Sequence, residues 1–154
     1  MTLTVPSLDS LTLNVSLETH VRASLEATFA ALLEQIGPGN ETPDGKPLPM
    51  TIEARPGGRW FRDLGQDNGH FWGHVQAIKR PALLEICGPL FISNPVMSNL
   101  QYRLKETSEG TLITFRHLTM GRLPDGMGDG MGTGWSALHR RVRARAEAQA
   151  GGGR

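Results

Sequence analysis

The sequence predicts an α+β domain built from one antiparallel sheet of about six or seven strands and two helices, the longer of them near the C-terminus. Three observations lead to this fold class. Strand-like segments follow one another between residues 50 and 119, and the connections between them are too short for parallel crossovers. Apolar residues at helical spacing occur in two places, after residue 24 and after residue 133. With 154 residues, of which 38% are hydrophobic, the chain fits one domain with its own core.

The N-terminal part predicts a strand followed by a helix. Apolar and polar side chains alternate along residues 11–21, which is typical of a half-buried strand. Ser24 is a suitable N-cap, and apolar residues follow at helical spacing as far as Ile36, where Gly37 and Pro38 end the helix. We expect residues 1–10 to form a flexible lead-in to a domain that spans residues 11–149.

The segment after this helix predicts a long surface loop. Residues 37–49 contain four prolines and three glycines, which exclude a continuous helix or a central strand. Its length makes the loop a candidate lid over a binding site. A tolerated insertion without a function explains the same composition at least as well.

Six further segments predict an antiparallel meander. Each is rich in strand-forming residues, and sequences with turn chemistry such as Pro-Gly-Gly, Asp-Asn-Gly and Ser-Glu-Gly separate them. The segment that begins at Val96 alternates most clearly, so one of its faces is expected to meet the core. The predicted strands are residues 50–54, 59–64, 70–79, 83–88, 96–106 and 111–119.

The C-terminal part predicts a glycine-rich connector and a helix. Residues 125–132 hold two copies of Asp-Gly-Met-Gly, which indicate a flexible segment whose Met127 and Met131 could close over an apolar ligand. A disordered connector is the simpler interpretation. From about Thr133, apolar residues form one helical stripe that starts at Trp135. Residues 150–154 are expected to be a disordered tail.

Residues 53–81 are the most informative stretch, because they concentrate aromatic side chains in a chain with few of them. Strand alternation predicts that Trp60 and Phe71 share an inner face, which would make them part of a ligand wall. It leaves Phe61 and Trp72 on the outer face, where an exposed aromatic pair would suit a homodimer or another protein partner. A cross-strand pair covered by a loop or by arginine side chains is an equal alternative.

The histidines and the single tyrosine are the candidate polar groups. His70 and His74 would stand ~13 Å apart on an extended strand, too far to bind one metal together, so we predict no metal site. His117 has the strand parity of the apolar Phe115, and it could anchor a ligand or transfer a proton. A structural histidine with internal partners is the favoured alternative. Tyr102 could offer its hydroxyl to the same space.

Several classes of function find no support in the sequence. A net charge of +1 gives no reason to expect nucleic acid, and neither a signal peptide nor an apolar stretch of membrane-spanning length is present. There is no phosphate loop, dinucleotide fingerprint or nucleophile elbow, so no cofactor is expected. Cys87 is the only cysteine, which excludes an internal disulfide and suits the cytoplasm.

The order of elements and five short segments resemble a known family. The segments are VRASLEATFAAL at 21–32, RPGGRW at 55–60, GHVQAI at 73–78, GT at 110–111 and GWSAL at 134–138. They resemble the START-like (SRPBCC) ligand-binding superfamily, specifically the branch of activator of Hsp90 ATPase homologues (AHSA1-like). The resemblance implies a helix-grip fold, in which a curved antiparallel sheet wraps around the last helix. It also implies a cavity between the two for an apolar or amphipathic small molecule. The loop at 38–49 lacks the tryptophan segment that the family usually has there.

Three functions remain open at this point. The leading hypothesis is binding of a small hydrophobic or aromatic ligand in that cavity, without a cofactor. The second is a cyclase-like or hydrolase-like enzyme on the same fold that uses His117 or Tyr102, and the third is an interaction module such as a chaperone partner. We favour binding over catalysis. The residues predicted to contact the ligand are Trp60, Phe71, Val75, Tyr102, Phe115, His117, Met127, Met131 and Trp135.

Overall fold

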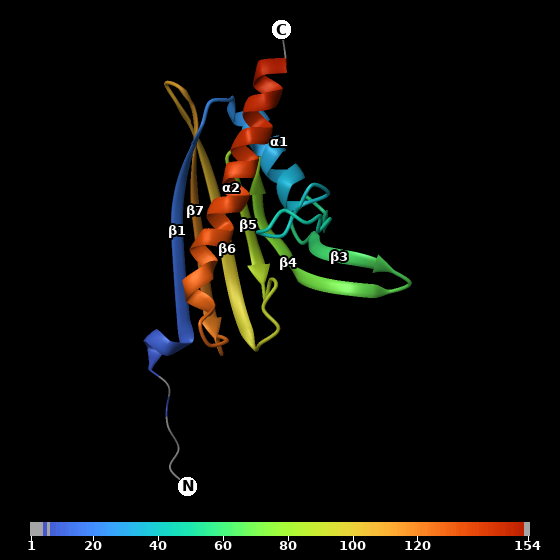
Figure 1. Cartoon of the computed structure of the whole chain (residues 1–154), viewed down its shortest axis with the longest axis vertical. Coiled ribbons are helices and arrows are strands. Elements are labelled where there is room, and N and C mark those ends of the chain that lie inside the picture. The colour runs from blue at the N-terminus through green and yellow to red at the C-terminus, as the bar shows by residue number, and fades with distance from the viewer. Residues whose placement is uncertain (1–4, 6, 153–154) are drawn as a thin grey trace.

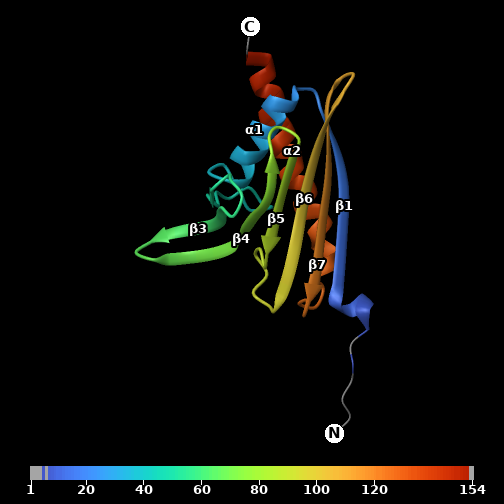
Figure 2. The same cartoon turned by 180° about the vertical axis from the view of Figure 1, so that it is seen from behind.

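A computed structural model describes residue 5 and residues 7–152 of the chain. One antiparallel sheet of seven strands carries both α-helices on the same face, as the two opposite views in Figure 1 and Figure 2 show. This arrangement confirms the predicted α+β helix-grip fold. The elements are η1 (Leu8–Leu11), β1 (Thr12–Val21), α1 (Leu25–Ile36), β2 (Thr51–Ile52), β3 (Arg59–Gly65), β4 (Asn68–Lys79), β5 (Leu83–Gly88), β6 (Val96–Thr107), β7 (Gly110–Gly121) and α2 (Met127–Gly152).

The sheet has the strand order β1-β7-β6-β5-β4-β3-β2, so the meander is joined at one edge by the N-terminal strand. β6 and β7 pair along their full length, from Val96 opposite Gly121 to Thr107 opposite Gly110. The hairpin of β3 and β4 extends away from the rest of the molecule in both views. The inner face of the sheet and the two helices therefore enclose the core.

α1 begins and ends where the sequence predicts. The side chain of Ser24 accepts a hydrogen bond from the backbone N–H of Ala27 at 3.1 Å, as expected of an N-cap. At the other end, the N–H of Gly37 donates to the carbonyl of Glu34. Apolar side chains on one face, among them Leu32, are buried against the sheet and α2.

The core follows the alternation of the long central strands. Leu100 and Tyr102 of β6 and Ile113 and Phe115 of β7 are fully buried, and α2 covers them with Val142 among other residues. Burying one such apolar side chain contributes roughly 1.5–3 kcal/mol to folding. The inward parity predicted for these strands is therefore confirmed.

The predicted start of the last helix is wrong. α2 begins at Met127 rather than near Thr133, so six of the eight residues of the Asp-Gly-Met-Gly repeat, 127–132, are helical. Each glycine costs the helix about 1 kcal/mol relative to alanine, but Met131 lies one turn before Trp135 and is buried with it. Packing outweighs the low helix propensity of this segment.

The termini can be compared with their predictions only in part. α2 continues to Gly152, so residues 150–152 are helical where we expected a tail, and residues 153–154 lie outside the described range. Of the expected lead-in, residues 8–10 belong to η1, whereas residues 1–4 and 6 lie outside the description. In the described part of the chain, no helix combines the length and the apolar character needed to cross a bilayer.

The predicted faces of Phe71 and Trp72 are wrong because β3 and β4 contain a bulge. Trp60 lies opposite Gly73 but Phe61 lies opposite Phe71, so Trp72 is an extra residue between the two pairs. A one-residue shift moves the side chains before it to the other face of the sheet. Trp72 is consequently 9% exposed and Phe71 39% exposed, the reverse of the expectation.

Candidate functional site

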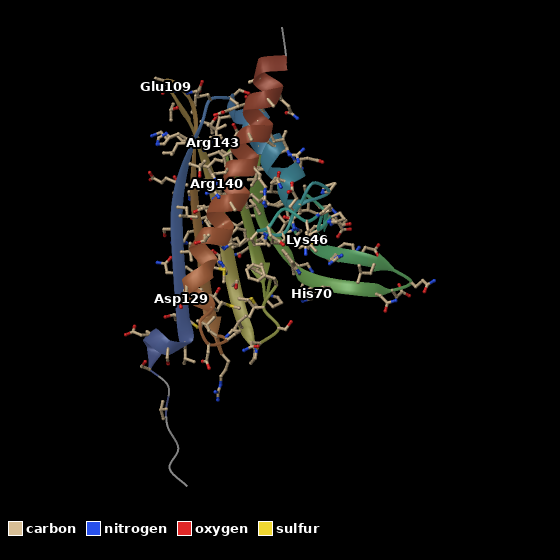
Figure 3. The ribbon with its side chains drawn as sticks, in the orientation of Figure 1. Lys46, His70, Glu109, Asp129, Arg140 and Arg143 are labelled. Carbon is tan, nitrogen blue, oxygen red and sulfur yellow. The ribbon has the colours of Figure 1, made fainter. Side chains whose placement is uncertain are left out.

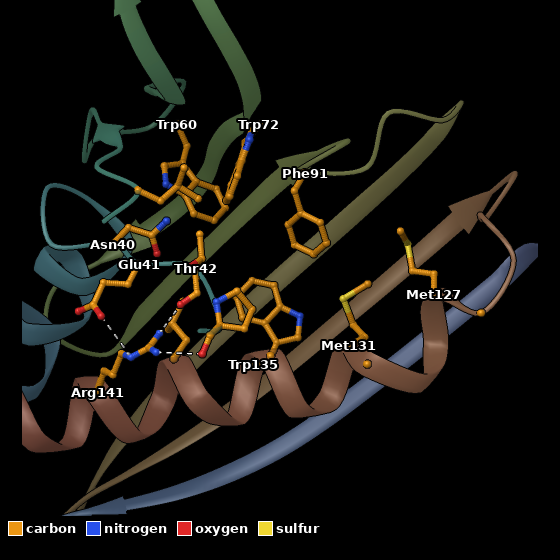
Figure 4. Close-up of a pocket in the computed structure, with 16 residues that line it drawn as sticks. Asn40, Glu41, Thr42, Trp60, Trp72, Phe91, Met127, Met131, Trp135 and Arg141 are labelled. Atoms are coloured by element: carbon orange, nitrogen blue, oxygen red, sulfur yellow. Dashed lines mark hydrogen bonds and ion pairs between the residues drawn. The ribbon is translucent and has the colours of Figure 1, made fainter. Parts of the chain in front are cut away.

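A pocket of about 410 Å³ lies between the N-terminal half of α2, the base of the β3–β4 hairpin and the loop after α1. Figure 4 shows these three walls around it. The exposed charged side chains of Lys46, Asp129 and Arg140, which Figure 3 labels, are not among the residues that line it. The lining residues are Asn40, Glu41, Thr42, Pro43, Leu48, Trp60, Trp72, Phe91, Gly126, Met127, Gly130, Met131, Gly134, Trp135, Leu138 and Arg141.

One face of α2 forms the floor of the pocket. The lining residues of this helix recur every three or four positions from Met127 to Arg141, which is the spacing of a single helical face. Gly130 and Gly134 lie on that face between the larger side chains. A Cβ added at Gly130 would meet no atom within 4 Å, so the missing side chain leaves open space at the pocket.

Four aromatic rings line the pocket in succession. Trp60 meets Trp72 edge to face with their centroids 5.0 Å apart, Trp72 lies 5.6 Å from Phe91, and Phe91 lies 6.2 Å from Trp135. Such contacts between ring edges and faces are favourable and fix the orientation of the rings. The indole N–H of Trp60 donates to the carbonyl of Ile36 at 2.8 Å. Aromatic rings therefore form much of the pocket wall.

Arg141 holds the third wall in place. Its guanidinium donates to the backbone carbonyls of Thr42 at 3.0 Å and Pro43 at 3.1 Å, and it lies 3.6 Å from the carboxylate of Glu41. A planar group with several donors suits such a set of oxygen acceptors. The loop predicted as a lid or an insertion thus forms a wall of the pocket, fixed to α2 by one residue.

His117 belongs to a buried polar cluster behind Trp135. The indole N–H of Trp135 donates to Nδ1 of His117 at 3.1 Å, so Nδ1 carries no proton. The neutral ring is then protonated at Nε2, which lies 2.6 Å from Oγ1 of Thr119 and 3.2 Å from Oγ of Ser98. Burial lowers the pKa of His117 to about 4. Both ring nitrogens are occupied, as in the structural alternative that we favoured.

Tyr102 pairs with a histidine that the sequence analysis did not consider. Its hydroxyl lies 3.0 Å from Nε2 of His139, and both residues are buried. Burial raises the pKa of Tyr102 and lowers that of His139 to about 4. Nδ1 of His139 has no hydrogen-bond partner among the described residues. The signal for His139 was its position one turn after Trp135, on the inward face of the helix.

The structure brings only some of the predicted site residues together. Trp60, Met127, Met131 and Trp135 line the pocket. The other inward residues, Val75, Tyr102, Phe115 and His117, are buried in the core and do not line it. Phe71 lies on the outer side of the hairpin, where its ring is 4.8 Å from that of His74. The pocket residues that sequence reasoning missed are Trp72, Phe91, Gly126, Gly130, Gly134, Leu138, Arg141 and the loop residues 40–43 and 48.

His70 and His74 have separate neighbours. Nδ1 of His70 accepts a hydrogen bond from the indole N–H of Trp72 at 3.1 Å, whereas the ring of His74 packs on Phe71. Across residues 5 and 7–152, no three His, Cys, Asp or Glu side chains are grouped so that they could hold a metal ion. The hydrogen bond from Trp72 to His70 instead fixes the indole ring of Trp72 in the pocket wall.

Comparison of the sequence with family models gives one match. The model described as activator of Hsp90 ATPase homolog 1-like protein matches residues 45–147, about two thirds of the chain. The matched range includes the β3–β4 hairpin, the rest of the meander and nearly all of α2. A comparison with curated proteins finds none that matches.

Solved structures share the fold at low sequence identity. An AHSA1-like protein from Aeromonas hydrophila is 14% identical, with a TM-score of 0.60 and coverage of 90% of this chain and 94% of that one. Protein MLL2253 from Mesorhizobium loti is 18% identical, with a TM-score of 0.63 and coverage of 88% and 98%. The di-domain ARO/CYC protein StfQ of the steffimycin biosynthetic pathway is 13% identical, with a TM-score of 0.68 and coverage of 94% of this chain and 53% of StfQ. At these identities the likeness establishes the fold alone.

Proposed function

The chain belongs to the activator of Hsp90 ATPase homolog 1-like family, and from this premise we propose that it binds a small hydrophobic or aromatic molecule between the sheet and α2. The observation that carries the proposal is the pocket of about 410 Å³ between them. Its size lies within the range of small-molecule sites, which are mostly apolar and concave. The side chains that line it include three tryptophans, one phenylalanine and two methionines.

The physical basis of binding would be the removal of apolar surface from water. Each Å² of buried apolar surface contributes about 25 cal/mol, and flat rings gain further from contacts with the edges and faces of Trp60, Trp72 and Trp135. Met127 and Met131 can adapt to ligands of different outline, because a methionine side chain is flexible and polarisable. These features favour a class of flat apolar ligands rather than one shape.

Titration with N-phenyl-1-naphthylamine, an uncharged fluorescent probe, tests the proposal. All three tryptophans of the chain line the pocket, so a bound probe should quench their emission saturably as its own fluorescence rises. The variant Gly130→Phe should weaken binding at least ~10-fold, because the new ring occupies the open space at Gly130. An unsaturable titration would contradict the proposal.

Gly132→Phe provides the matched control. A Cβ at Gly132 also meets no atom within 4 Å, but this residue lies off the pocket-lining face of α2. Both variants remove a helical glycine and add the same ring to the same helix. Equal weakening by the two variants would show that the probe binds elsewhere.

Catalysis through His117 or Tyr102 is not part of the proposal. Neither side chain lines the pocket, and each forms a buried hydrogen bond with another side chain. A general base must reach the proton that it removes, directly or through one water molecule. These observations weigh against the enzyme hypothesis and in favour of binding.

The interaction-module hypothesis loses the aromatic pair on which it rested. Trp72 lies in the pocket wall, and Phe61 is stacked under the guanidinium of Arg59 at 4.6 Å. A homodimer therefore stays a prediction, testable by the mass of the protein in solution. A cytoplasmic location also stays a prediction, based on the single cysteine.

A further inference from the structure

The carboxamide of Asn40 is the feature of the pocket that the proposed function does not use. Asn40 follows α1 in the loop that forms one wall, and it is only 4% exposed although it lines the pocket. No hydrogen bond joins its carboxamide to another residue in the described part of the chain. Figure 4 shows the group on the inner side of the loop, close to Trp60 and Thr42. The amide atoms of Asn40 are not completely enclosed and so reach the open space of the pocket, where a ligand or water can supply the hydrogen bonds that the amide lacks.

The other polar side chains of the pocket already have partners. The three indole N–H groups donate to Ile36, His70 and His117. The hydroxyl of Thr42 bonds to Asp44 and accepts from the N–H of Lys46. The guanidinium of Arg141 is held by Glu41 and by two loop carbonyls. Glu41 has only this ion pair and is partly exposed, so Asn40 is the one buried polar side chain of the lining whose polar atoms are left to bind a ligand.

The backbone of Asn40 is fixed and the residue is 4% exposed, so the carboxamide has little freedom before a ligand arrives. Its N–H donates to the carbonyl of Gly37 at 3.0 Å, and its carbonyl accepts from the N–H of Leu48 at 2.8 Å. A polar group that is positioned in advance loses little freedom on binding, which favours recognition. The carboxamide can donate two hydrogen bonds and accept others, so it suits a hydroxyl, a carbonyl or an amide.

The charges around the pocket favour an uncharged ligand. Arg141 and Glu41 are the ionisable residues of the lining, and they lie 3.6 Å apart. The two charges therefore compensate each other, and the lining carries no net charge that would attract a charged ligand. Moving an unpaired charge from water into an apolar site is strongly unfavourable.

We propose that Asn40 recognises the ligand and that the ligand is an uncharged aromatic molecule with one hydroxyl, carbonyl or amide group. This inference rests on the proposed function and narrows it to a chemical class. The rings would lie along the aromatic wall, and the polar group would bond to the carboxamide beside Trp60. An apolar pocket without this contact would instead prefer the ligand that has no polar group.

A pair of matched probes tests the inference through displacement of N-phenyl-1-naphthylamine. 2-Naphthol and 2-methylnaphthalene have the same rings and differ in a hydroxyl against a methyl group. The variant Asn40→Leu should shift the ratio of their Kd values by about tenfold toward 2-methylnaphthalene, because it removes one partner of a single hydrogen bond. Asn99→Leu is the control, since Asn99 lies outside the pocket and bonds to Gln76; it should leave the ratio unchanged.

The outcomes separate this inference from the function on which it rests. An unchanged ratio in Asn40→Leu overturns the role of Asn40, while binding of both probes still supports the pocket. Failure of every probe to bind the wild-type protein overturns the proposed function as well. Asn40→Ala, which also lacks the amide, should give the same shift and replaces Asn40→Leu where thermal unfolding shows that the leucine variant does not fold. Tighter binding of 2-naphthoate than of 2-naphthol would contradict the preference for an uncharged ligand.

Discussion

The pocket and the buried histidine cluster meet at Trp135, yet they differ in whether their polar side chains already have hydrogen-bond partners. In the cluster, Trp135 donates to His117, whose other ring nitrogen reaches Thr119 and Ser98. In the pocket, rings and methionine side chains face the open space, and the carboxamide of Asn40 forms no hydrogen bond with another described residue. Both ring nitrogens of His117 are paired within the cluster, whereas the pocket offers apolar surface and one amide.

This difference shows that a lowered histidine pKa does not mark the candidate site in this protein. Groups with shifted pKa values often cluster at functional sites, but structural networks shift them too. Burial alone accounts for the low pKa values of His117 and His139. The candidate site is instead marked by open volume and by an amide that lacks partners.

The largest expected effect is a difference in stability loss between two phenylalanine variants, one beside the histidine cluster and one at the pocket. Phe115 is fully buried against Tyr102, Trp135 and His139, so Phe115→Ala should lower the free energy of unfolding by about 3–5 kcal/mol. Phe91 is 37% exposed at the pocket, so Phe91→Ala should cost only about 1–2 kcal/mol but weaken probe binding. Urea denaturation and probe titration measure the two quantities. Equal losses of stability would remove the distinction between core and pocket.

Lowering the pH should destabilise the fold through the buried histidines His117 and His139 rather than through the pocket. The pKa of His117 and of His139 is about 4 in the folded protein against an ordinary value of 6.5. Between pH 6.5 and 4 the unfolded chain therefore binds more protons, and the free energy of unfolding falls as the pH falls through this window. The loss is at most about 3 kcal/mol per histidine. Urea denaturation at pH 7.5, 5.5 and 4.5 measures it.

The double variant His117→Gln with His139→Gln is the control for this pH dependence. It should flatten the change in stability between pH 6.5 and 4.5, and an undiminished slope would assign the effect to other groups. The carboxylate of Glu53 affects the free energy of unfolding only at lower pH, because hydrogen bonds from Arg59 lower its pKa to about 2. Its contribution is present above pH 4.5 and is lost as the pH falls toward 2.

Replacement of Arg141 should affect the pocket more than the cluster. Arg141→Met keeps most of the side-chain length but removes the bonds to Thr42 and Pro43, so we expect a stability loss of about 1–2 kcal/mol. Hydrogen exchange should become faster at the amides of Thr42 and residues 44–46 and stay unchanged in β7. Faster exchange in β7 as well would mean that Arg141 supports the whole fold.

The smallest expected effect concerns the glycines of α2. Gly132→Ala should raise the free energy of unfolding by up to about 1 kcal/mol, because alanine favours a helix and its Cβ would meet no atom within 4 Å. Probe affinity should not change, since Gly132 lies off the pocket face. A loss of stability in thermal unfolding would indicate that this part of the chain is not helical in solution.

Most of the fold follows from patterns within short segments. The bounds of β5 and α1 agree with the sequence prediction, because strand alternation and an N-cap at Ser24 are local signals. No local pattern of this kind predicts the bulge beside Trp60. Phe71 and Trp72 are adjacent and similar in chemistry, so either could be placed inward, and the pairing with β3 decides between them.

The candidate site could be predicted only where it coincides with such patterns. Trp60 and Trp135 were found because each has the inward parity of its element. Asn40 and Arg141 were missed because about 100 residues separate the loop from the helix, and a single sequence gives no sign of their proximity. The start of α2 was missed for a related reason, since packing of Met131 outweighs the low helix propensity of the glycines around it.

The most direct test of the binding proposal is a methyl NMR titration of the wild-type protein with 2-naphthol. Met127 and Met131 line the pocket, whereas Met97 and Met120 are exposed and pair with each other across β6 and β7. Binding in the pocket predicts saturable shifts of the first two methyl signals and of the three indole N–H signals, with no change at Met97 and Met120. Shifts confined to Met97 and Met120, or no saturable shift at all, would contradict it.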